Sequence, residues 1–219
     1  MIPVKKVIDS EFVIVGGGIA GLSAAIAAGE AGVKATLLEK ADTRRSGSGC
    51  GGNDHFFCYL PEVHGPDIRR ILREMMLNMV GDRMDGDLAL FFLEKSGEMV
   101  HRWHEWGINM KPYGGFEFRG HAFPGRPRIW LKYDGHNQKA VLNGKARELG
   151  TEVMNHHSVL DVAVSEGRVV GGLALDTSRE EPSFTLVRSP NVLLATGMTT
   201  RLYNSTVTPG YLFNSTSCP

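Results

Sequence analysis

The stretch EFVIVGGGIAGLSAA, residues Glu11–Ala25, decides the fold. Four apolar residues that favour β-structure, Phe12–Val15, come directly before three glycines, and a run of small residues follows them. Gly32 then closes a helix over Leu22–Ala31, and a second apolar run follows over Lys34–Leu38. This order predicts one right-handed βαβ unit with a tight turn between the first strand and the helix.

The composition is that of a globular chain without a charge imbalance. Its 219 residues are 42% hydrophobic, which is enough for a buried core and one α/β domain. Lysine plus arginine equals aspartate plus glutamate at 24 each, so neither nucleic acid nor an anionic membrane surface is expected as a partner. No stretch approaches the roughly 18 apolar residues of a spanning helix, so no membrane insertion is expected.

The cysteines do not form a framework or a metal motif. Cys50, Cys58 and Cys218 are odd in number and show no C-x-x-C spacing. We therefore expect no disulfide network, no zinc or iron–sulfur site in this chain, and a reducing cytoplasmic location.

After the βαβ unit, the hydrophobic pattern predicts a helical insertion and then a β-rich segment. The insertion spans about residues 54–110, is mostly helical over Pro66–Gly107 and has a break near Val80–Asp87. Lys111–Arg128 is expected to be irregular, and His136–Leu149 to be a helix. Turns join the middle three of the five following strands into an antiparallel meander. The five expected strands are Thr151–Asn155, Val159–Val164, Arg168–Asp176, Ser183–Arg188 and Val192–Ala195.

The pattern Gly16-x-Gly18-x-x-Gly21 has the context that a dinucleotide fingerprint requires, because it follows a strand and opens a helix. Gly16 permits the tight turn, Gly18 lets the backbone approach a pyrophosphate, and Gly21 lets helix and strand pack closely. The pyrophosphate then meets the helix N-terminus, where unpaired N–H groups and the helix dipole favour negative charge.

Glu39 supplies the acidic residue that such a site needs. It ends the second strand eighteen residues after Gly21, where a carboxylate accepts a hydrogen bond from a ribose hydroxyl. A carboxylate in this place repels a 2′-phosphate, so NADP is not expected. The alternative, a glycine turn that only packs tightly, is disfavoured by the presence of strand, helix and Glu39 together.

A second match, Gly47-x-Gly49-x-x-Gly52, lies in the loop TRRSGSGCGGN, residues Thr43–Asn53. No strand pattern precedes it and no clear helix follows, so it is not expected to be an independent fingerprint. The loop is too rich in glycine for a helix and too long for a simple turn. We expect it to be shaped around a ligand.

Several motifs together resemble a known family. Glu39-Lys40 is followed by ADTRRSGSGCGGN, the helical insertion ends in WHEWGI, and GRVVGGLALD and NVLLATG come later in the chain. This arrangement resembles the flavoprotein subunits of the fumarate reductase and succinate dehydrogenase family. Arg45-Ser46-Gly47 most resembles the branch of the adenylylsulfate reductase α subunits. The resemblance covers nearly the whole chain but corresponds to the N-terminal part of such subunits.

The resemblance implies FAD rather than NAD, bound by a Rossmann-like α/β domain with a parallel sheet, an antiparallel meander and the helical insertion. This domain is expected to span residues 1–219 and to be truncated at its C-terminus. Members with covalent flavin carry a histidine where this chain has Gly47, so non-covalent FAD is expected. The same resemblance implies which residues contact each part of the cofactor. The pyrophosphate is bound by Gly16, Gly18, Ile19, Ala20 and Gly21, and the adenosine ribose by Glu39. Between there and the isoalloxazine lie Lys40, Arg45, Ser46, Gly47, Ser48 and Gly52, the adenine lies at Val159, and beside the phosphates and ribose are Ala195, Thr196 and Gly197.

The function implied is that of an FAD-dependent oxidoreductase, or of its N-terminal fragment, which transfers electrons or hydride. The adenylylsulfate reductase likeness also implies an iron–sulfur partner subunit, because this chain has no cluster ligands of its own. No catalytic residue is assigned. Two alternatives stay open, namely a non-catalytic FAD-binding module that a partner chain completes, and an NAD-binding dehydrogenase.

For four further groups of residues we favour a structural role over a functional one. Asn53, Asp54 and His55 suit a polar helix start with Asp54 as the cap rather than a flavin or substrate contact. His101 and His104 suit the edge of an amphipathic helix rather than a metal site. The other two groups are Trp103, Trp106, Phe91 and Phe92, expected to be core rather than an electron path, and Arg119, His121, Arg126 and Arg128, expected to lie in a solvated loop rather than an anion site.

Overall fold

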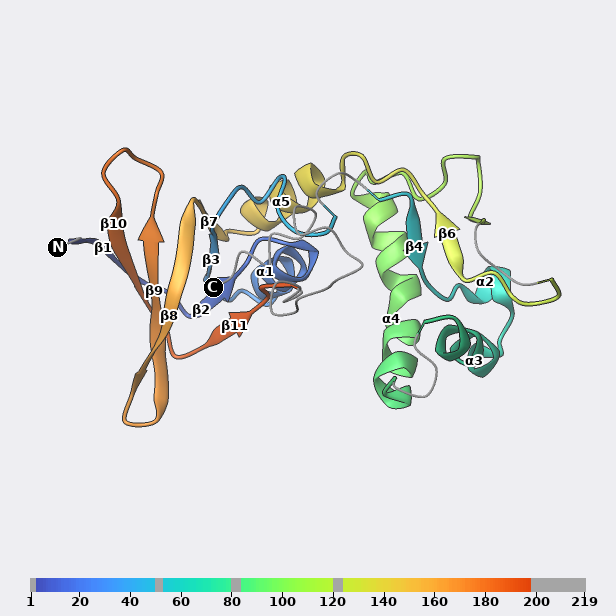
Figure 1. Cartoon of the computed structure of the whole chain (residues 1–219). Coiled ribbons are helices and arrows are strands. Elements are labelled where there is room, and N and C mark those ends of the chain that lie inside the picture. Colours follow the sequence, from blue (N-terminus) through green and yellow to red (C-terminus); the bar gives the residue numbers. More distant parts are fainter. Residues whose placement is uncertain (1–2, 50–52, 80–83, 120–123, 198–219) are drawn as a thin grey trace, which may run out of the picture. The chain divides into compact units, whose positions relative to one another are not determined.

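The computed structural model describes residues 3–49, 53–79, 84–119 and 124–197 (Figure 1). The chain divides into two compact units. The first unit combines Met1–Gly51 with Lys139–Pro219, and the second unit is the segment Gly52–Gln138 between them.

A four-stranded parallel sheet forms the centre of the first unit. All five residues of β3 are buried, as expected for a parallel strand that is covered on both faces. The sequence interpretation of βαβ geometry around the glycine turn is therefore confirmed. In sheet order the strands are β11 (Val192–Leu194), β2 (Phe12–Val15), β3 (Ala35–Glu39) and β7 (Glu152–Asn155).

A helix packs on one face of this sheet and the antiparallel sheet packs on the other. The helix α1 (Ile19–Glu30) approaches β2 at Gly21, which lies against the side chain of Ile14. Side chains alternate along a strand, so Val13 and Val15 point to the opposite face, where they share one apolar cluster with residues of the antiparallel sheet. The first unit is thus layered as helix, parallel sheet and antiparallel sheet.

The antiparallel sheet contains the predicted meander and one strand that the sequence analysis missed. Its strands β8 (His157–Ser165), β9 (Arg168–Asp176) and β10 (Ser183–Arg188) pair in succession, which confirms the meander. The missed strand, β1 (Val4–Asp9), pairs in parallel with β10 at the edge. Its apolar side chains Val4 and Val7 are each 54% exposed. Because the strand has no buried face, its sequence lacks the alternation of apolar and polar residues from which a strand can be predicted.

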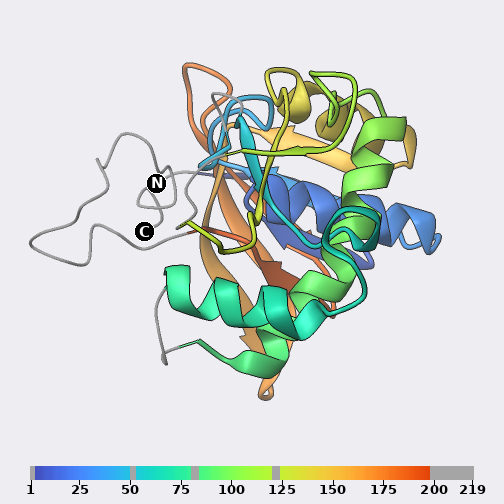
Figure 2. The same cartoon turned by 90° about the vertical axis from the view of Figure 1, so that its right-hand side faces the viewer.

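The second unit contains the predicted helices and a small sheet that was not predicted. The helices α3 (Ile68–Met79) and α4 (Gly86–Glu105) agree with the helical region expected over Pro66–Gly107, and they pack side by side (Figures 1 and 2). The short helix α2 (Pro61–His64) precedes that region. None of the helices in the described ranges is long and apolar enough to span a membrane. The sheet has the order β4 (His55–Phe57), β6 (Trp130–Lys132) and β5 (Glu117–Phe118).

The helix start expected at Asp54 is wrong, because His55 opens β4. The Asp54 carboxylate accepts hydrogen bonds from the Lys132 ammonium and, at 2.7 Å, pairs with His55 Nδ1. These bonds hold the pKa of Asp54 below its usual value, with the Lys132 bond as the largest cause. A short polar segment before three residues of strand has no period from which the strand can be recognised.

The expectation of an aromatic core is confirmed for Trp103 and wrong for Phe91 and Phe92. Trp103 is buried with its ring centroid 5.2 Å from that of Phe56, whereas Phe91 and Phe92 are 57% and 40% exposed. The reason is helical phase, because α4 buries a stripe that runs through Leu93, Ser96, Val100 and Trp103 at intervals of three and four residues.

The last helix, α5 (Gln138–Glu148), agrees with the predicted helix at His136–Leu149. Its apolar residues Leu142 and Ala146 are fully buried. The helix also brings one charged side chain, Lys139, into the interior of the first unit.

His64 generates a pH prediction. Its Nδ1 accepts the Leu60 N–H at 3.0 Å, and its Nε2–H then donates to the Arg128 carbonyl at 2.9 Å, so the neutral ring is the form that fits. Burial, the largest cause, lowers the pKa of His64. The folded state therefore resists protonation, and the stability that His64 contributes is present above the unfolded pKa of about 6.5 and is lost as the pH falls below it.

We expect urea denaturation to show a steeper loss of stability between pH 7 and pH 5 in the wild-type chain than in His64→Gln. The exposed His136, which pairs with Asp134 at 2.7 Å, provides the matched control. His136→Gln should retain the wild-type dependence on pH. Equal slopes for His64→Gln and the wild-type chain would contradict this role.

Candidate functional site

The residues singled out by the fingerprint come together at the carboxyl ends of β2, β3 and β11. The Gly16 N–H donates to the Leu38 carbonyl at 2.8 Å, and the Ala195 N–H donates to the Val15 carbonyl at 2.8 Å. All of these residues belong to the first unit. Open α/β sheets bind ligands at this edge, so the location is that of a ligand site.

The turn between β2 and α1 brings backbone atoms too close for a Cβ at two positions, Gly16 and Gly21, and at Gly17 a Cβ would lie 2.4 Å from the buried side chain of Thr43. Gly16 has φ +102°, and a Cβ there would lie 2.5 Å from the Ala195 carbonyl oxygen. A Cβ on Gly21 would lie 1.9 Å from the Gly16 carbonyl oxygen. Both glycines therefore exist for close approach within the protein, as the fingerprint requires.

Gly18 differs from these two because its side of the turn is open. The nearest atom to a Cβ on Gly18 would be the Gly47 Cα, at 3.9 Å. Gly47 itself has φ +79° and faces Gly18 from the loop 43–49. A Cβ on Gly47 would lie 3.0 Å from the Gly18 Cα, so the two glycine backbones lie close together and neither residue covers the start of α1 with a side chain.

The N-terminus of α1 fits an anionic group. Gly18 is the N-cap residue and offers no side-chain hydrogen bond, and the first turn contains no acidic residue. The first N–H groups of a helix have no partner within the helix, and the helix dipole adds positive potential there. Ile19 is half-buried and Ala20 exposed at this end. The residues present thus fit the pyrophosphate of a dinucleotide.

Glu39 lies at this turn and does not point away from it. The side chain is 5% exposed, Oε2 accepts the Gly17 N–H at 2.6 Å, and Oε1 accepts the Ala41 N–H at 2.8 Å. A carboxylate has about four lone-pair directions, so these two bonds leave acceptor capacity for hydroxyl donors. The geometry is compatible with the ribose contact expected from the sequence.

The Gly17 carbonyl is bound by two side chains that approach from different elements. Ser46 Oγ donates to it at 3.2 Å from the loop, and Lys139 Nζ donates to it from α5. Lys139 is only 3% exposed. The sequence analysis identified neither Gly17 nor Lys139, because one lysine in a predicted helix gives no sign of which way its side chain points.

The loop 43–49 is fixed at its beginning. Thr43 is fully buried, its Oγ1–H donates to Asn143 Oδ1 at 2.7 Å, and its N–H donates to Asn155 Oδ1 at 3.0 Å. Arg44 forms two hydrogen bonds from its guanidinium to Asp42, at 3.1 and 2.8 Å. The bonds from Arg44 are the largest cause that lowers the pKa of Asp42 to about 2. The Arg45 and Ser46 N–H groups both donate to the Asp42 carbonyl at 2.9 Å, so the loop is also held at these two residues.

The structure brings most of the other predicted residues to the same edge. Ser46 is buried and Gly47 half-buried, whereas Arg45, Ser48 and Gly197 are exposed. Val159 differs, because it packs against the apolar cluster between the two sheets. Three further residues, Lys40, Ala195 and Thr196, are half-buried. Four residues named in the sequence analysis lie outside the described ranges, namely Gly52, Cys50, His121 and Cys218.

The candidate residues of the second unit have partners of their own. His101 Nε2 pairs with Glu62 at 3.1 Å, and Arg126 pairs with Glu74 at 3.2 Å. Arg119 pairs with Glu117. Within the described part of the chain, no three His, Cys, Asp or Glu side chains gather in a way that could hold a metal ion.

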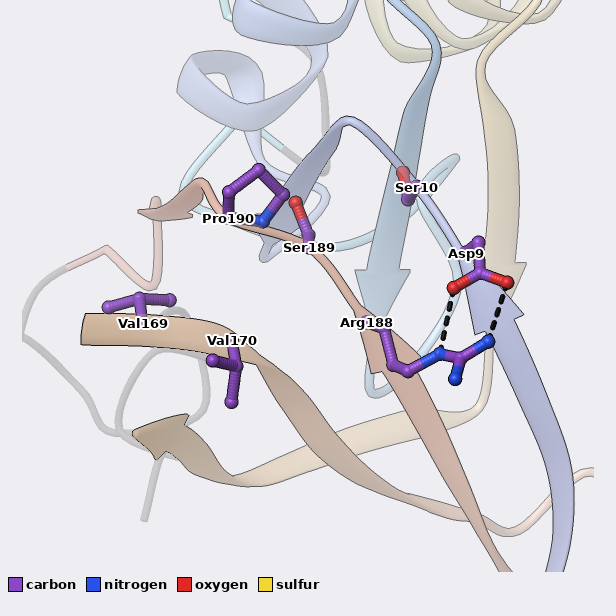
Figure 3. A pocket seen from close by; sticks show the side chains of 7 residues that line it. All are labelled: Asp9, Ser10, Val169, Val170, Arg188, Ser189 and Pro190. Carbon is purple, nitrogen blue, oxygen red and sulfur yellow. Dashed lines mark hydrogen bonds and ion pairs between the residues drawn. The ribbon is translucent and has the colours of Figure 1, made fainter. Parts of the chain in front are cut away.

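A shallow hollow of about 330 Å³ lies elsewhere on the first unit (Figure 3). It contains the paired Asp9 and Arg188, whose two hydrogen bonds are each 2.7 Å long. Ser10, which also lines the hollow, precedes β2, so the hollow is at the amino end of that strand and not at the glycine turn. The residues that line it are Asp9, Ser10, Val169, Val170, Arg188, Ser189 and Pro190.

Residues 11–217 match the model of one protein family, whose description is FAD binding domain. The chain belongs to this FAD binding family. The cofactor implied by the resemblance, FAD, is therefore confirmed in place of NAD. A search of proteins with curated functions found no significant match.

Solved structures share the fold. Adenylylsulfate reductase from Archaeoglobus fulgidus is 23% identical with a TM-score of 0.76, over 96% of this chain and 34% of that one. E. coli quinol fumarate reductase is 22% identical with a TM-score of 0.77, over 94% of this chain and 36% of that one. A 3-ketosteroid dehydrogenase from Rhodococcus jostii RHA1 is 20% identical with a TM-score of 0.70, over 90% of this chain and 49% of that one.

These matches confirm the predicted Rossmann-like FAD-binding fold and the resemblance to fumarate reductase and adenylylsulfate reductase flavoproteins. The FAD binding chain described here spans about a third to a half of the length of these three structures.

Gly21→Ala should disrupt the site because the new methyl group has no space. We expect a loss of about 1–3 kcal/mol of stability from overpacking and at least tenfold weaker FAD binding as the turn shifts. The measurements are urea denaturation and FAD titration followed by flavin fluorescence.

Gly144→Ala is the matched control, since Gly144 lies within α5 and a Cβ there meets nothing within 4 Å. This change should leave FAD binding unaltered and stabilise the helix by up to about 1 kcal/mol. Similar behaviour of the two variants would show that close packing at Gly21 is unimportant.

Proposed function

We propose that this chain is the N-terminal, cofactor-binding part of an FAD-dependent oxidoreductase of the fumarate reductase, succinate dehydrogenase and adenylylsulfate reductase type. The observation that carries the proposal is the open glycine turn at the start of α1, with the buried carboxylate of Glu39 beside it, in a chain of the FAD binding family. Bound FAD would supply the two-electron redox chemistry, and the protein would supply position and electrostatics.

The proposed roles follow the positions in the first unit. The amides at the start of α1 bind the pyrophosphate, and Glu39 accepts from the adenosine ribose. Gly16 and Gly21 shape this turn. The remaining proposed cofactor contacts are Lys40, Arg45, Ser46, Gly47, Ser48, Gly52, Val159, Ala195, Thr196 and Gly197.

Arg45 is the cation of the loop that is available to a ligand. Arg44 is held by Asp42, whereas Arg45 is exposed and makes no ion pair within the described ranges. A guanidinium near the isoalloxazine would stabilise the negative charge of reduced flavin. We assign this role to Arg45.

Gly47 supports non-covalent binding, because it has no side chain that could form a bond to the flavin. An iron–sulfur partner subunit is also part of the proposal. It is supported by the likeness to adenylylsulfate reductase, and these 219 residues contain three cysteines where a cluster is typically held by four. We also propose a reducing cytoplasmic location, which is supported by cysteines that are odd in number and show no disulfide pattern.

A second candidate function is a non-catalytic FAD-binding module that a partner completes. It is kept because the residues at the glycine turn are proposed to hold the cofactor, and none of them is assigned a catalytic role. Flavin reduction by small donors separates the two candidates. Repeated turnover by the 219-residue chain would exclude the module, whereas FAD binding without turnover would favour it.

The proposal predicts that the purified chain binds FAD, and that acid precipitation leaves the flavin in the supernatant. Flavin that stays with the precipitated protein would contradict non-covalent binding. A chain that takes up no added FAD would contradict the proposal as a whole.

Glu39→Gln should raise the dissociation constant of FAD by about tenfold or more, since hydrogen bonds to a charged group contribute about 1.5–3 kcal/mol. Glu152→Gln is the control, because Glu152 is an exposed residue of β7 that pairs with Lys6. Fluorescence titration should show unchanged affinity for this control. Equal affinities of Glu39→Gln and the wild-type chain would remove Glu39 from the site.

A further inference from the structure

The peptide that joins Gly17 and Gly18 is held from one side by two donors. Ser46 Oγ and Lys139 Nζ both donate to the Gly17 carbonyl oxygen. Ser46 and Lys139 are 2% and 3% exposed, and they come from the loop and from α5. An ammonium group is costly to bury unless it is hydrogen-bonded, so its placement on one particular carbonyl requires an explanation.

Peptide geometry provides that explanation. A trans peptide is planar, with its C=O and N–H pointing in opposite directions. The chain has no cis peptide bond among its described residues. Because the Gly17 carbonyl is held toward Lys139 and Ser46, the Gly18 N–H of the same peptide is directed away from them.

The Gly18 N–H is one of the free donors at the start of α1. Gly18 is the N-cap residue, and its own carbonyl accepts the Leu22 N–H at 3.0 Å. A Cβ on Gly18 would meet only the Gly47 Cα, at 3.9 Å, so no side chain lies against this residue. A hydrogen bond to the carbonyl of a peptide polarises that peptide and strengthens the N–H at its other end.

We propose that Lys139 is a positioning residue for the FAD pyrophosphate, which orients and polarises the Gly18 N–H through the Gly17 carbonyl. This inference rests on the proposed function. Lys139 acts from behind the turn, without a contact to the cofactor, and Ser46 supports the same carbonyl. The arrangement therefore strengthens binding of the ligand's phosphates and does not affect binding of its adenosine.

The test compares ligands with and without phosphates. FAD is titrated into the full chain by fluorescence, and ADP and adenosine are measured by competition with bound FAD. Lys139→Met removes the positive charge and the hydrogen bond to the Gly17 carbonyl but keeps a long unbranched side chain. FAD and ADP should bind this variant about tenfold more weakly or worse, and adenosine should compete within about twofold of its wild-type value.

Lys145→Met is the matched control, because Lys145 lies on the same helix and pairs with Glu148 at 3.2 Å near the surface. All three ligands should bind this variant as they bind the wild-type chain. Unchanged ADP binding by Lys139→Met would overturn the inference. Equal losses for ADP and adenosine would also overturn it, because a lysine that only stabilises the fold affects both ligands alike.

Ser46→Ala keeps the inference testable if Lys139→Met does not fold. It removes the second donor to the same carbonyl, so ADP should bind about threefold more weakly while adenosine is unaffected. Wild-type ADP binding by Ser46→Ala would then overturn the inference. Failure of the wild-type chain to bind FAD is a separate result, which contradicts the proposed function and the inference that rests on it.

Discussion

The site depends on the chain turning from β2 directly into α1 with no side chain in the way. Gly16 allows the turn with a positive φ, and Gly21 brings α1 within contact of the Gly16 carbonyl. The same turn leaves the first N–H groups of α1 without side-chain partners on one side, while Ser46 and Lys139 hold the Gly17 carbonyl from the other. Ligand binding and packing thus use opposite sides of one short segment.

Much of this arrangement could be predicted from the sequence because it has local signatures. The strand Phe12–Val15 was predicted with its exact bounds, as were β9 and β10, because apolar runs between turn residues specify them. Glu39 could be located because its spacing from the glycines is fixed by the length of one helix and one strand. The start of α1 was placed three residues late, since glycines lower helix propensity even where the turn requires them.

What the sequence did not reveal depends on contacts between distant segments. β1 is an exposed edge strand whose pairing with β10 joins residues about 180 positions apart, and β4 has three residues, too few for a period. Lys139 approaches Gly17 across 122 residues of sequence. Phe91 and Phe92 were misplaced because the buried stripe of α4 passes beside them. In each case packing between elements decides the outcome, and periodicity within one element does not.

Amide chemical shifts test the central claim most directly. The account predicts that adding ADP to the ¹⁵N-labelled chain shifts the resonances of Gly18, Ile19 and Ala20 strongly, because their N–H groups would bind the phosphates. Arg188, in the hollow at the amino end of β2, should stay unchanged. Unshifted amides at the start of α1, with the largest changes elsewhere in the chain, would contradict it.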